Sequence, residues 1–251
     1  MIPWIESQVI QLGPIPLRTW GTFVACGFLA GAWIAAKRAK KNGLDSKKVW
    51  DIAMWLFVAA FVGARVFHVL FYEQAYFLAH PWQVFDPRLP GYAIYGGFIA
   101  CALTFWYWVK KNGLDFIQWA DTLIWGLPLG CGIGRIGCFL IHDHPGTLSN
   151  SLLAVKYPDG QARHDLGLYL SITGFVIALI FLAFDQKARH PGFWFGLFLA
   201  LDSASRLWLD FYRVVDIRYL GLTPTQWVTI PLIVIGLWMV RPRFRSSSLS
   251  S

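Results

Sequence analysis

The stretch LGCGIGRIGCFLIHDHPG, residues 129–146, places one arginine in an apolar, glycine-rich run that ends in titratable side chains. The arginine is Arg135, and the titratable groups are His142, Asp143 and His144. A guanidinium binds phosphate oxygens through two parallel hydrogen bonds, and glycine lets a ligand approach the backbone closely. Histidine is the usual general acid or base near neutral pH. The stretch therefore predicts an anion site with proton-handling groups beside it.

Two more arginines lie in apolar surroundings, Arg65 in FVGARVFHVLFY and Arg206 in SASRLWLDFYR. An arginine at the middle of a bilayer costs about 2.5–3.5 kcal/mol on insertion scales and usually faces the protein interior. Asp210 follows Arg206 at the i, i+4 spacing of one helix face, so an internal ion pair is the alternative to ligand binding for this pair. Few acids accompany the three arginines, which together predict a site for the phosphate of a phospholipid head group in the outer leaflet.

The His-Asp-His sequence has two other interpretations. It is compatible with a polar loop just above the membrane. A metal site would need further ligands, for example from His164 and Asp165, and the ligand spacing gives no support for one. The four cysteines all fall in apolar runs and form no CxxC pair, which argues against a disulfide. The sequence therefore predicts no metal and no cofactor.

The composition is that of an integral membrane protein. The 251 residues are 56% hydrophobic and 14% charged, whereas soluble domains carry about 25% charged residues. Several apolar runs approach the roughly 20 residues that cross a bilayer. The fold class predicted is an all-α polytopic bundle of about seven transmembrane helices, forming a single domain over residues 1–251. The candidate spans are 19–36, 50–72, 92–109, 117–138, 166–184, 192–210 and 224–240.

The net charge of +8 could suggest a nucleic-acid partner, but its distribution along the chain does not. Of the 22 Lys and Arg residues, 13 fall in alternate connections between the spans and only six in the remaining connections and the N-terminal segment. Because cytoplasmic loops carry the excess of basic residues, we expect the N-terminus outside and the C-terminus in the cytoplasm. The partners expected from this pattern are membrane lipids, not nucleic acid.

One internal repeat is visible. The segment KKNGLD occurs at residues 40–45 and again at 110–115, and residues 21–70 and 91–140 are identical at 15 of 50 aligned positions, with Arg65 opposite Arg135. Lys-Lys-Asn-Gly is typical of a helix C-terminus that ends in a glycine cap. We interpret the repeat as a duplicated two-helix unit.

The residues also resemble a known family. GIGRIGCFLIHDHPG is similar to the signature of the bacterial prolipoprotein diacylglyceryl transferases, Gly-Arg-x-Gly-Asn-Phe-x-Asn-x-Glu-x-x-Gly. Other segments match the family in order and spacing across nearly the whole chain: LGPIPLRTWGTFVACGF, GARVFHVLFY, YAIYGGFIA, SRLWLDFYR and GLTPTQWVTIP.

The resemblance implies a function. The family transfers the diacylglyceryl group of phosphatidylglycerol to the lipobox cysteine of a prolipoprotein in the bacterial inner membrane, forming a thioether and releasing glycerol 1-phosphate. By position, Arg135 and Arg206 correspond to the family's essential arginines. The resemblance also implies substrate-binding roles for a further set of residues: Arg65, Gly96, Gly97, Gly134, Gly137, Cys138 and Asp210.

The chain departs from the family at several polar positions. Tyr95 replaces the histidine before Gly-Gly, Cys138 and Ile141 replace two asparagines, Asp143 replaces a glutamate, and Asp202 replaces a tyrosine. Two explanations remain open. The proton-handling groups have moved, with a catalytic group among Tyr95, His142, Asp143 and His144, or the chain is a non-catalytic or substrate-shifted lipid-binding paralogue. A lipid transporter is a third and weaker alternative.

Overall fold

The computed structural model describes residues 1–86, 89, 91–186, 189–214 and 218–241. The chain divides into two compact units, one of residues 1–38 with 120–251 and one of residues 39–119, and each is described by itself. The prediction of a single domain over residues 1–251 stays a prediction.

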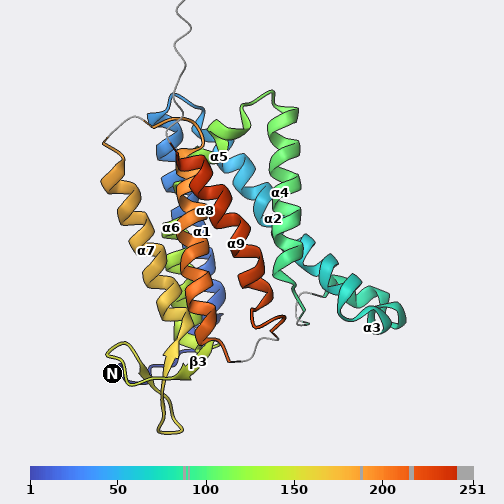
Figure 1. The fold of residues 1–251 in the computed structure, drawn as a ribbon. Helices are drawn as coiled ribbons and strands as arrows, with labels where there is room; N and C mark the ends of the chain where they lie inside the picture. Colours follow the sequence, from blue (N-terminus) through green and yellow to red (C-terminus); the bar gives the residue numbers. More distant parts are fainter. Residues whose placement is uncertain (87–88, 90, 187–188, 215–217, 242–251) are drawn as a thin grey trace, which may run out of the picture. The chain divides into compact units, whose positions relative to one another are not determined.

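The first unit is a group of long helices with two small sheets at one end (Figure 1). Its helices are α1 (Thr19–Lys41), the bent pair α5 (Phe116–Ile124) and α6 (Leu127–Ile141), α7 (Leu166–Phe184), α8 (Phe193–Leu209) with the 3₁₀ turn η2 (Asp210–Tyr212), and α9 (Pro224–Val240). Helix α6 packs on α7, α7 on α8, and α8 on α9.

The two sheets are antiparallel and were not expected from the sequence. Strands β1 (Val9–Leu12) and β2 (Ile15–Arg18) form a hairpin in which Val9 pairs with Arg18 and Leu12 with Ile15. The second sheet has the order β3-β5-β4, from β3 (Pro145–Leu148), β4 (Val155–Lys156) and β5 (Ala162–Asp165). The fold is mostly helical, consistent with the predicted all-α membrane protein, with these two small sheets added.

The second unit contains α2 (Ser46–Phe71), α3 (Gln74–Ala79), the 3₁₀ turn η1 (Pro81–Phe85) and α4 (Ile94–Lys111). Helix α2 packs along α4. The contact is close because glycines face each other: a Cβ built on Gly96 would lie 2.3 Å from the carbonyl oxygen of Gly63.

The expected glycine caps are confirmed at both copies of Lys-Lys-Asn-Gly. Gly43 and Gly113 have left-handed φ values of 71° and 61°. Leu44 N donates to Ala39 O at 2.8 Å, and Leu114 N donates to Val109 O at 3.0 Å. These are the bonds that close a helix behind a left-handed residue, so the repeated segment ends α1 and α4 in the same way.

Each of the seven predicted spans overlaps a helix. Among the described residues, three helices are long and apolar enough to cross a membrane, α1, α2 and α7, and a fourth span results if α5 and α6, bent by 43°, count as one. Helix α9 is a shorter apolar helix. The count of seven spans therefore remains a prediction.

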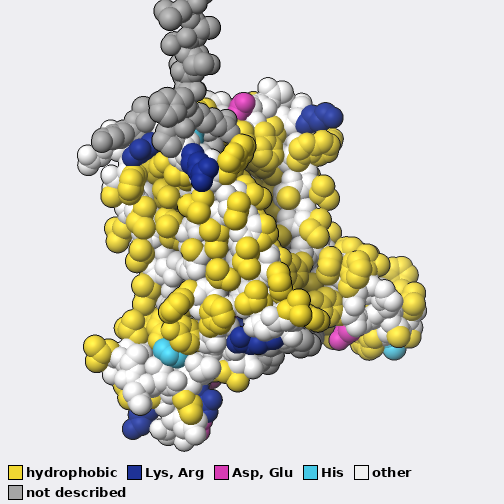
Figure 2. Space-filling view, viewed as in Figure 1, with side chains coloured by type: hydrophobic (Ala, Val, Ile, Leu, Met, Phe, Trp, Pro, Cys, Tyr) yellow, Lys and Arg dark blue, Asp and Glu magenta, His cyan; other side chains and the backbone are white. Residues whose placement is uncertain are grey.

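The helices of the first unit present apolar side chains outward. Val176, Leu179 and Leu182 on α7 and Val234, Leu237 and Trp238 on α9 are exposed. On the face shown in Figure 2, apolar side chains cover the middle of these helices, and Lys and Arg side chains gather toward the ends. An apolar surface of this kind is typical of helices that face lipid.

Candidate active site

Arg135 lies near the C-terminal end of α6, which is held against α1 by glycines. A Cβ built on Gly126 would lie 1.9 Å from Gly31 O, and one built on Gly27 would lie 2.3 Å from Gly130 O. Small residues spaced four apart let two helix backbones approach closely, as in membrane helix pairs. The close approach fixes the position of the helix turn that carries Arg135.

The side chain of Arg135 is half-buried and makes few polar contacts with the described residues. Among the described residues it makes one hydrogen-bond contact, a long one of 3.9 Å from Nη1 to Cys138 Sγ, and no salt bridge. The atom nearest to a Cβ built on Gly134 is 3.9 Å away, in Val24, whereas Gly137 packs tightly on Trp20. Arg135 and Gly134 therefore keep donors and space for a ligand, while Gly137 serves helix packing.

Arg206 is paired with Asp202, not with Asp210 as the spacing suggested. Its Nε lies 2.7 Å from Asp202 Oδ2, at i−4 on α8. Asp210 instead accepts from Thr223 Oγ1 at 2.6 Å and lies 3.2 Å from Arg213 Nε. The i, i+4 rule applies inside a helix, but α8 ends at Leu209 and the following 3₁₀ turn directs the Asp210 carboxylate to the start of α9.

The charges of Arg135 and Arg206 influence the same region of the first unit. The charges of Arg135, Arg206 and Asp202 all fall within electrostatic range of the Cys131 thiol, one turn before Arg135 on α6. The bond to Asp202 uses Nε of Arg206, and no described residue bonds its two terminal nitrogens, which remain for a further partner. Two guanidiniums and one carboxylate near one point favour an anionic ligand.

His142 belongs to a buried network. Its Nδ1 lies 2.7 Å from Asp165 Oδ2 and its Nε2 lies 3.1 Å from Ile5 O, and the side chains of His142 and Asp165 are each 1% exposed. The ring of Trp4 stacks on the imidazole at 3.9 Å. Both ring nitrogens already face acceptors inside the protein, so neither is directed at a substrate thiol.

Asp165 is the centre of this network, whereas the sequence named it only as a possible further metal ligand. It also accepts from Tyr157 OH at 3.1 Å and caps α7 by accepting from Leu168 N at 3.0 Å. Burial and the neighbouring Asp165 carboxylate raise the pKa of Tyr157, so the phenol keeps its proton and donates. An acidic residue directly before an apolar run is an N-cap signal, which could have identified Asp165.

Asp143 and His144, unlike His142, are partly exposed. His144 Nδ1 lies 2.8 Å from the main-chain oxygen of Asp143 and 3.8 Å from its Oδ1. One ligand atom from each of Cys138, Asp143 and His144 falls within 4.8 Å of the other two. Three of the predicted site residues therefore form one cluster beside Arg135.

His164, which the sequence offered as an additional metal ligand, has a different partner. Its Nδ1 lies 2.7 Å from Tyr169 OH, and its ring lies against Tyr212 with centroids 4.3 Å apart. Burial lowers the pKa of His164. The cluster of Cys138, Asp143 and His144 does not include it.

Arg65, in the second unit, is surrounded by main-chain carbonyls. Its Nε donates to Val84 O at 3.0 Å, its Nη1 to Gly91 O at 3.1 Å, and its Nη2 to Gln83 O at 2.9 Å. The side chain is buried, and the bonds attach the segment after α3 to α2. The observed contacts of Arg65 are structural, and its expected contact with a lipid phosphate stays a prediction.

The other predicted residues of the second unit lie in the first turns of α4. Tyr95 is half-buried, and Gly96 and Gly97 face α2, where a Cβ on Gly97 would lie 3.1 Å from Ala60 O. These glycines have a packing role whether or not they bind substrate.

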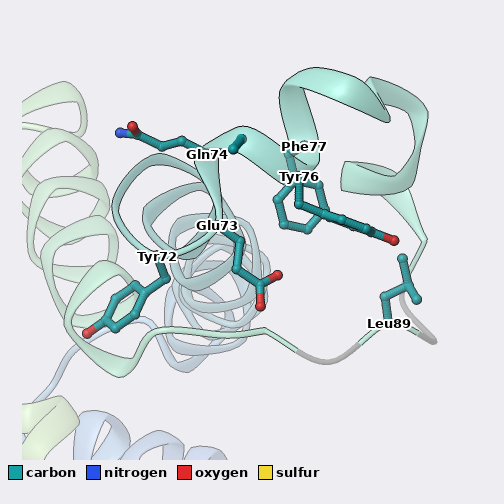
Figure 3. A pocket seen from close by; sticks show the side chains of 7 residues that line it. Tyr72, Glu73, Gln74, Tyr76, Phe77 and Leu89 are labelled. Atoms are coloured by element: carbon teal, nitrogen blue, oxygen red, sulfur yellow. The ribbon is translucent and has the colours of Figure 1, made fainter.

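A pocket of about 520 Å³ lies in the same unit, where α3 follows α2 (Figure 3). Glu73 and Tyr76 are among its lining residues, together with Leu89 across the opening. None of the residues predicted as site residues lines this pocket.

Comparison with known proteins identifies the family. The family model described as prolipoprotein diacylglyceryl transferase matches residues 7–241. This chain belongs to that family. A relative from Nitratidesulfovibrio vulgaris strain DP4 is 31% identical over 251 residues, covering 96% of this chain and 95% of the relative. Relatives from Pseudoalteromonas atlantica strain T6c and Vibrio atlanticus strain LGP32 are 29% and 31% identical, covering 95% of this chain and 91% and 90% of the relatives.

These three relatives are named phosphatidylglycerol–prolipoprotein diacylglyceryl transferase. For a member of the prolipoprotein diacylglyceryl transferase family, the geometry of three departures from the family pattern stands out. Cys138 and Asp143 lie in the cluster beside Arg135, and Asp202 supplies the carboxylate that pairs with Arg206. These three departures therefore lie beside Arg135 or Arg206.

Proposed function

We propose that this chain transfers the diacylglyceryl group of phosphatidylglycerol to the thiol of a prolipoprotein lipobox cysteine. Family membership over residues 7–241 and the printed names of the relatives support the activity. The observation that carries the assignment to a site is Arg135, whose guanidinium keeps most of its donors beside the open backbone of Gly134. A phosphate monoanion is the ligand that such a guanidinium binds through two parallel hydrogen bonds.

The reaction is a displacement at carbon. The thiol loses its proton, the sulfur forms a bond to the glyceryl carbon that carries the phosphate ester, and that carbon–oxygen bond breaks. The leaving glycerol 1-phosphate keeps the electron pair and gains negative charge. Guanidiniums placed at this phosphate stabilise the developing charge. Arg135 and the terminal nitrogens of Arg206 take this role in our proposal, with Gly134 admitting the phosphate.

The thiol proton needs an acceptor near Arg135. His144 and Asp143 are partly exposed at the end of α6, whereas both nitrogens of His142 face acceptors. An ordinary thiol has a pKa near 8.5, so modest assistance is enough to form the nucleophile. We assign proton transfer to the His144–Asp143 pair and a positioning role to His142. Tyr95 remains the second candidate, at the place of the family's histidine.

The membrane arrangement is part of the same proposal. We place the chain in the bacterial inner membrane as a multi-pass protein with seven spans, its N-terminus outside and its C-terminus in the cytoplasm. The excess of basic residues in alternate connections supports this orientation. It puts the end of α6, with His144, at the outer surface, where a secreted prolipoprotein presents its lipobox.

The test is a reconstituted transfer assay. Purified protein is incubated with phosphatidylglycerol and a lipobox peptide, and the thioether product and released glycerol phosphate are quantified. We expect Arg135→Lys and Arg206→Lys to lower the rate by roughly 10²–10³-fold, the range for losing a donor that stabilises developing charge. Lysine keeps the charge but offers no planar pair of donors.

Arg163→Lys is the matched control, because Arg163 is paired at the surface with Asp159. It should transfer at the rate of the parent. Lysine variants at positions 135 and 206 as active as the parent would refute the phosphate clamp. Phosphatidylglycerol binding with no product from the parent would refute the activity and leave a lipid-binding paralogue.

A further inference from the structure

Three metal-binding residue types meet at the end of α6. One ligand atom each from Cys138, Asp143 and His144 lies within 4.8 Å of the other two. Cys138 is buried, while Asp143 and His144 are partly exposed. The cluster therefore has a protein side, formed by the cysteine, and a side that solvent or substrate can reach.

The backbone brings the three residues together through one unusual conformation. Helix α6 ends at Ile141, and His142 adopts a left-handed conformation with a φ of 49°. This conformation is unfavourable by about 1–2 kcal/mol for a residue other than glycine. The bonds of His142 to Asp165 and Ile5 hold it there. Because the chain turns at His142, the next two side chains lie beside Cys138 instead of continuing along the helix.

The ligand set matches zinc in type and charge. Zinc binds thiolate at about 2.3 Å and imidazole or carboxylate at about 2.0–2.2 Å, so tetrahedral ligand atoms are separated by roughly 3.3–3.7 Å. His144 Nδ1 and Asp143 Oδ1 are 3.8 Å apart, close to this range. A thiolate and a carboxylate together neutralise the charge of Zn²⁺, which leaves the positive charge of Arg135 for a substrate phosphate.

We propose that Cys138, Asp143 and His144 bind a Zn²⁺ ion whose fourth position accepts the thiol of the acceptor substrate. Three protein ligands with one open position are the pattern of catalytic rather than structural zinc sites. A thiol that binds zinc is deprotonated. Zinc at this place would therefore do the work of the histidine that Tyr95 replaces, and the His144–Asp143 pair would act on the thiol proton through the ion rather than as its acceptor.

This role of the ion rests on the proposed transferase function. The thiol proton passes to solvent on coordination, the sulfur forms its bond to the glyceryl carbon, and the carbon–oxygen bond to the phosphate breaks. The electron pair leaves with glycerol phosphate. Arg135 Nη1 lies 3.9 Å from Cys138 Sγ, so a phosphate held by Arg135 lies next to the metal-bound sulfur. No oxidant or reductant is required.

The binding of the ion is tested without any activity measurement. The full-length protein in detergent is depleted of metal and titrated with Co²⁺, and thiolate-to-cobalt charge-transfer absorption and the visible ligand-field bands are recorded. Zn²⁺ is then added to displace the cobalt, and bound zinc is measured by elemental analysis. We expect one ion per chain with tetrahedral cobalt bands.

The variants assign the ligands. Cys138→Ser should abolish the charge-transfer band, and Asp143→Asn and His144→Ala should weaken Co²⁺ binding by more than the roughly 10–100-fold that loss of an outer-shell partner causes. Cys26→Ser and His80→Ala, at residues outside the cluster, should bind as the parent does. Thermal unfolding of each variant, measured without metal, identifies any that fail to fold. If Cys138→Ser fails to fold, Asp143→Asn, at an exposed residue, still tests the site.

The outcomes separate this proposal from the transferase function. Less than one ion per chain, or a cobalt spectrum unchanged in Cys138→Ser, would overturn the metal site. Transfer that persists at the parent rate in metal-free protein would overturn the role of the ion while the transferase assignment stands. Stoichiometric metal binding without any transfer would refute the transferase function and leave the metal site intact.

Discussion

At the scale of single residues, three buried or half-buried arginines have three different surroundings. Within the part of the chain that the structure describes, Arg65 donates to main-chain carbonyls, Arg206 pairs with Asp202, and Arg135 makes a single long contact to Cys138. A guanidinium has five donors in a fixed fork, so its neighbours determine how many remain for a ligand. By this criterion we propose Arg135 as the strongest phosphate ligand of the three.

Substituting the two histidines at the end of α6 should have opposite effects, one on stability and the other on the transfer rate. His142→Ala removes the imidazole partner of the buried Asp165 carboxylate, and breaking a buried pair of this kind typically lowers the free energy of unfolding by about 3–5 kcal/mol. His144→Ala removes a partly exposed group and should leave unfolding nearly unchanged, while the transfer rate falls by roughly 10²–10⁴-fold, the range for a general acid–base group.

Thermal unfolding in detergent and the transfer assay, performed on both variants, check this pair. Equal unfolding temperatures for His142→Ala and the parent would contradict the structural role of His142. A His144→Ala variant that transfers at the parent rate would remove His144 from the site and make Tyr95 the next residue to test.

At the scale of elements, the contact between α1 and α6 determines where Arg135 lies. Gly31 faces Gly126 and Gly27 faces Gly130, with no room for a side chain between the two backbones. The same arrangement joins α2 to α4 through Gly63 and Gly96. Helices in lipid lack a hydrophobic driving force for association, so close backbone packing of this kind replaces it.

Gly126→Ala should therefore be destabilising. Its new Cβ would lie 1.9 Å from Gly31 O, and overpacking of this kind lowers the free energy of unfolding by about 1–3 kcal/mol. Gly21→Ala, on α1 with no atom within 4 Å of the new Cβ, is the control, and it should be neutral or stabilising because alanine favours a helix. Thermal unfolding of both variants measures the difference. Equal changes in unfolding temperature for the two substitutions would refute the role of the glycine contact.

At the scale of the whole molecule, the two ends of the first unit differ in composition. At one end Arg38 pairs with Asp185 at 2.5 Å and lies 4.3 Å from the centroid of the Trp125 ring, and His190 lies 3.4 Å from Val240 O. At the other end are the sheet of β3, β4 and β5 and the N-terminal segment, where Ile2 N donates to Ala154 O. The first end gathers the connections that the charge pattern assigns to the cytoplasm, which supports the proposed orientation.

Cysteine labelling of intact cells tests that orientation. A membrane-impermeant thiol reagent should label Ser149→Cys, in the loop after β3, and should not label Asn42→Cys or Asn112→Cys until the membrane is permeabilised. The parent, with its four cysteines, is the control for background labelling. The opposite pattern would put the proposed site on the cytoplasmic side, where a secreted prolipoprotein does not present its lipobox.

The sequence alone determined the helices, their caps and the family. Apolar runs of membrane length predict helices wherever they occur, and Lys-Lys-Asn-Gly ends a helix by local geometry, since glycine adopts a left-handed conformation without penalty. The signature around Arg135 is a run of consecutive residues, so no tertiary information was needed to recognise it. These features depend on neighbours within one or two helix turns.

The partners of the charged groups were determined only by the tertiary structure. Arg206 pairs with Asp202 because α8 ends before Asp210, and Arg65 donates to carbonyls from a segment about 20 residues further along the chain. Cys138 meets Asp143 and His144 because one residue, His142, is held in a left-handed conformation by Asp165 and Ile5. A side chain's direction at the end of a helix depends on a single pair of backbone angles, and here those angles are set by contacts with residues far away in the chain.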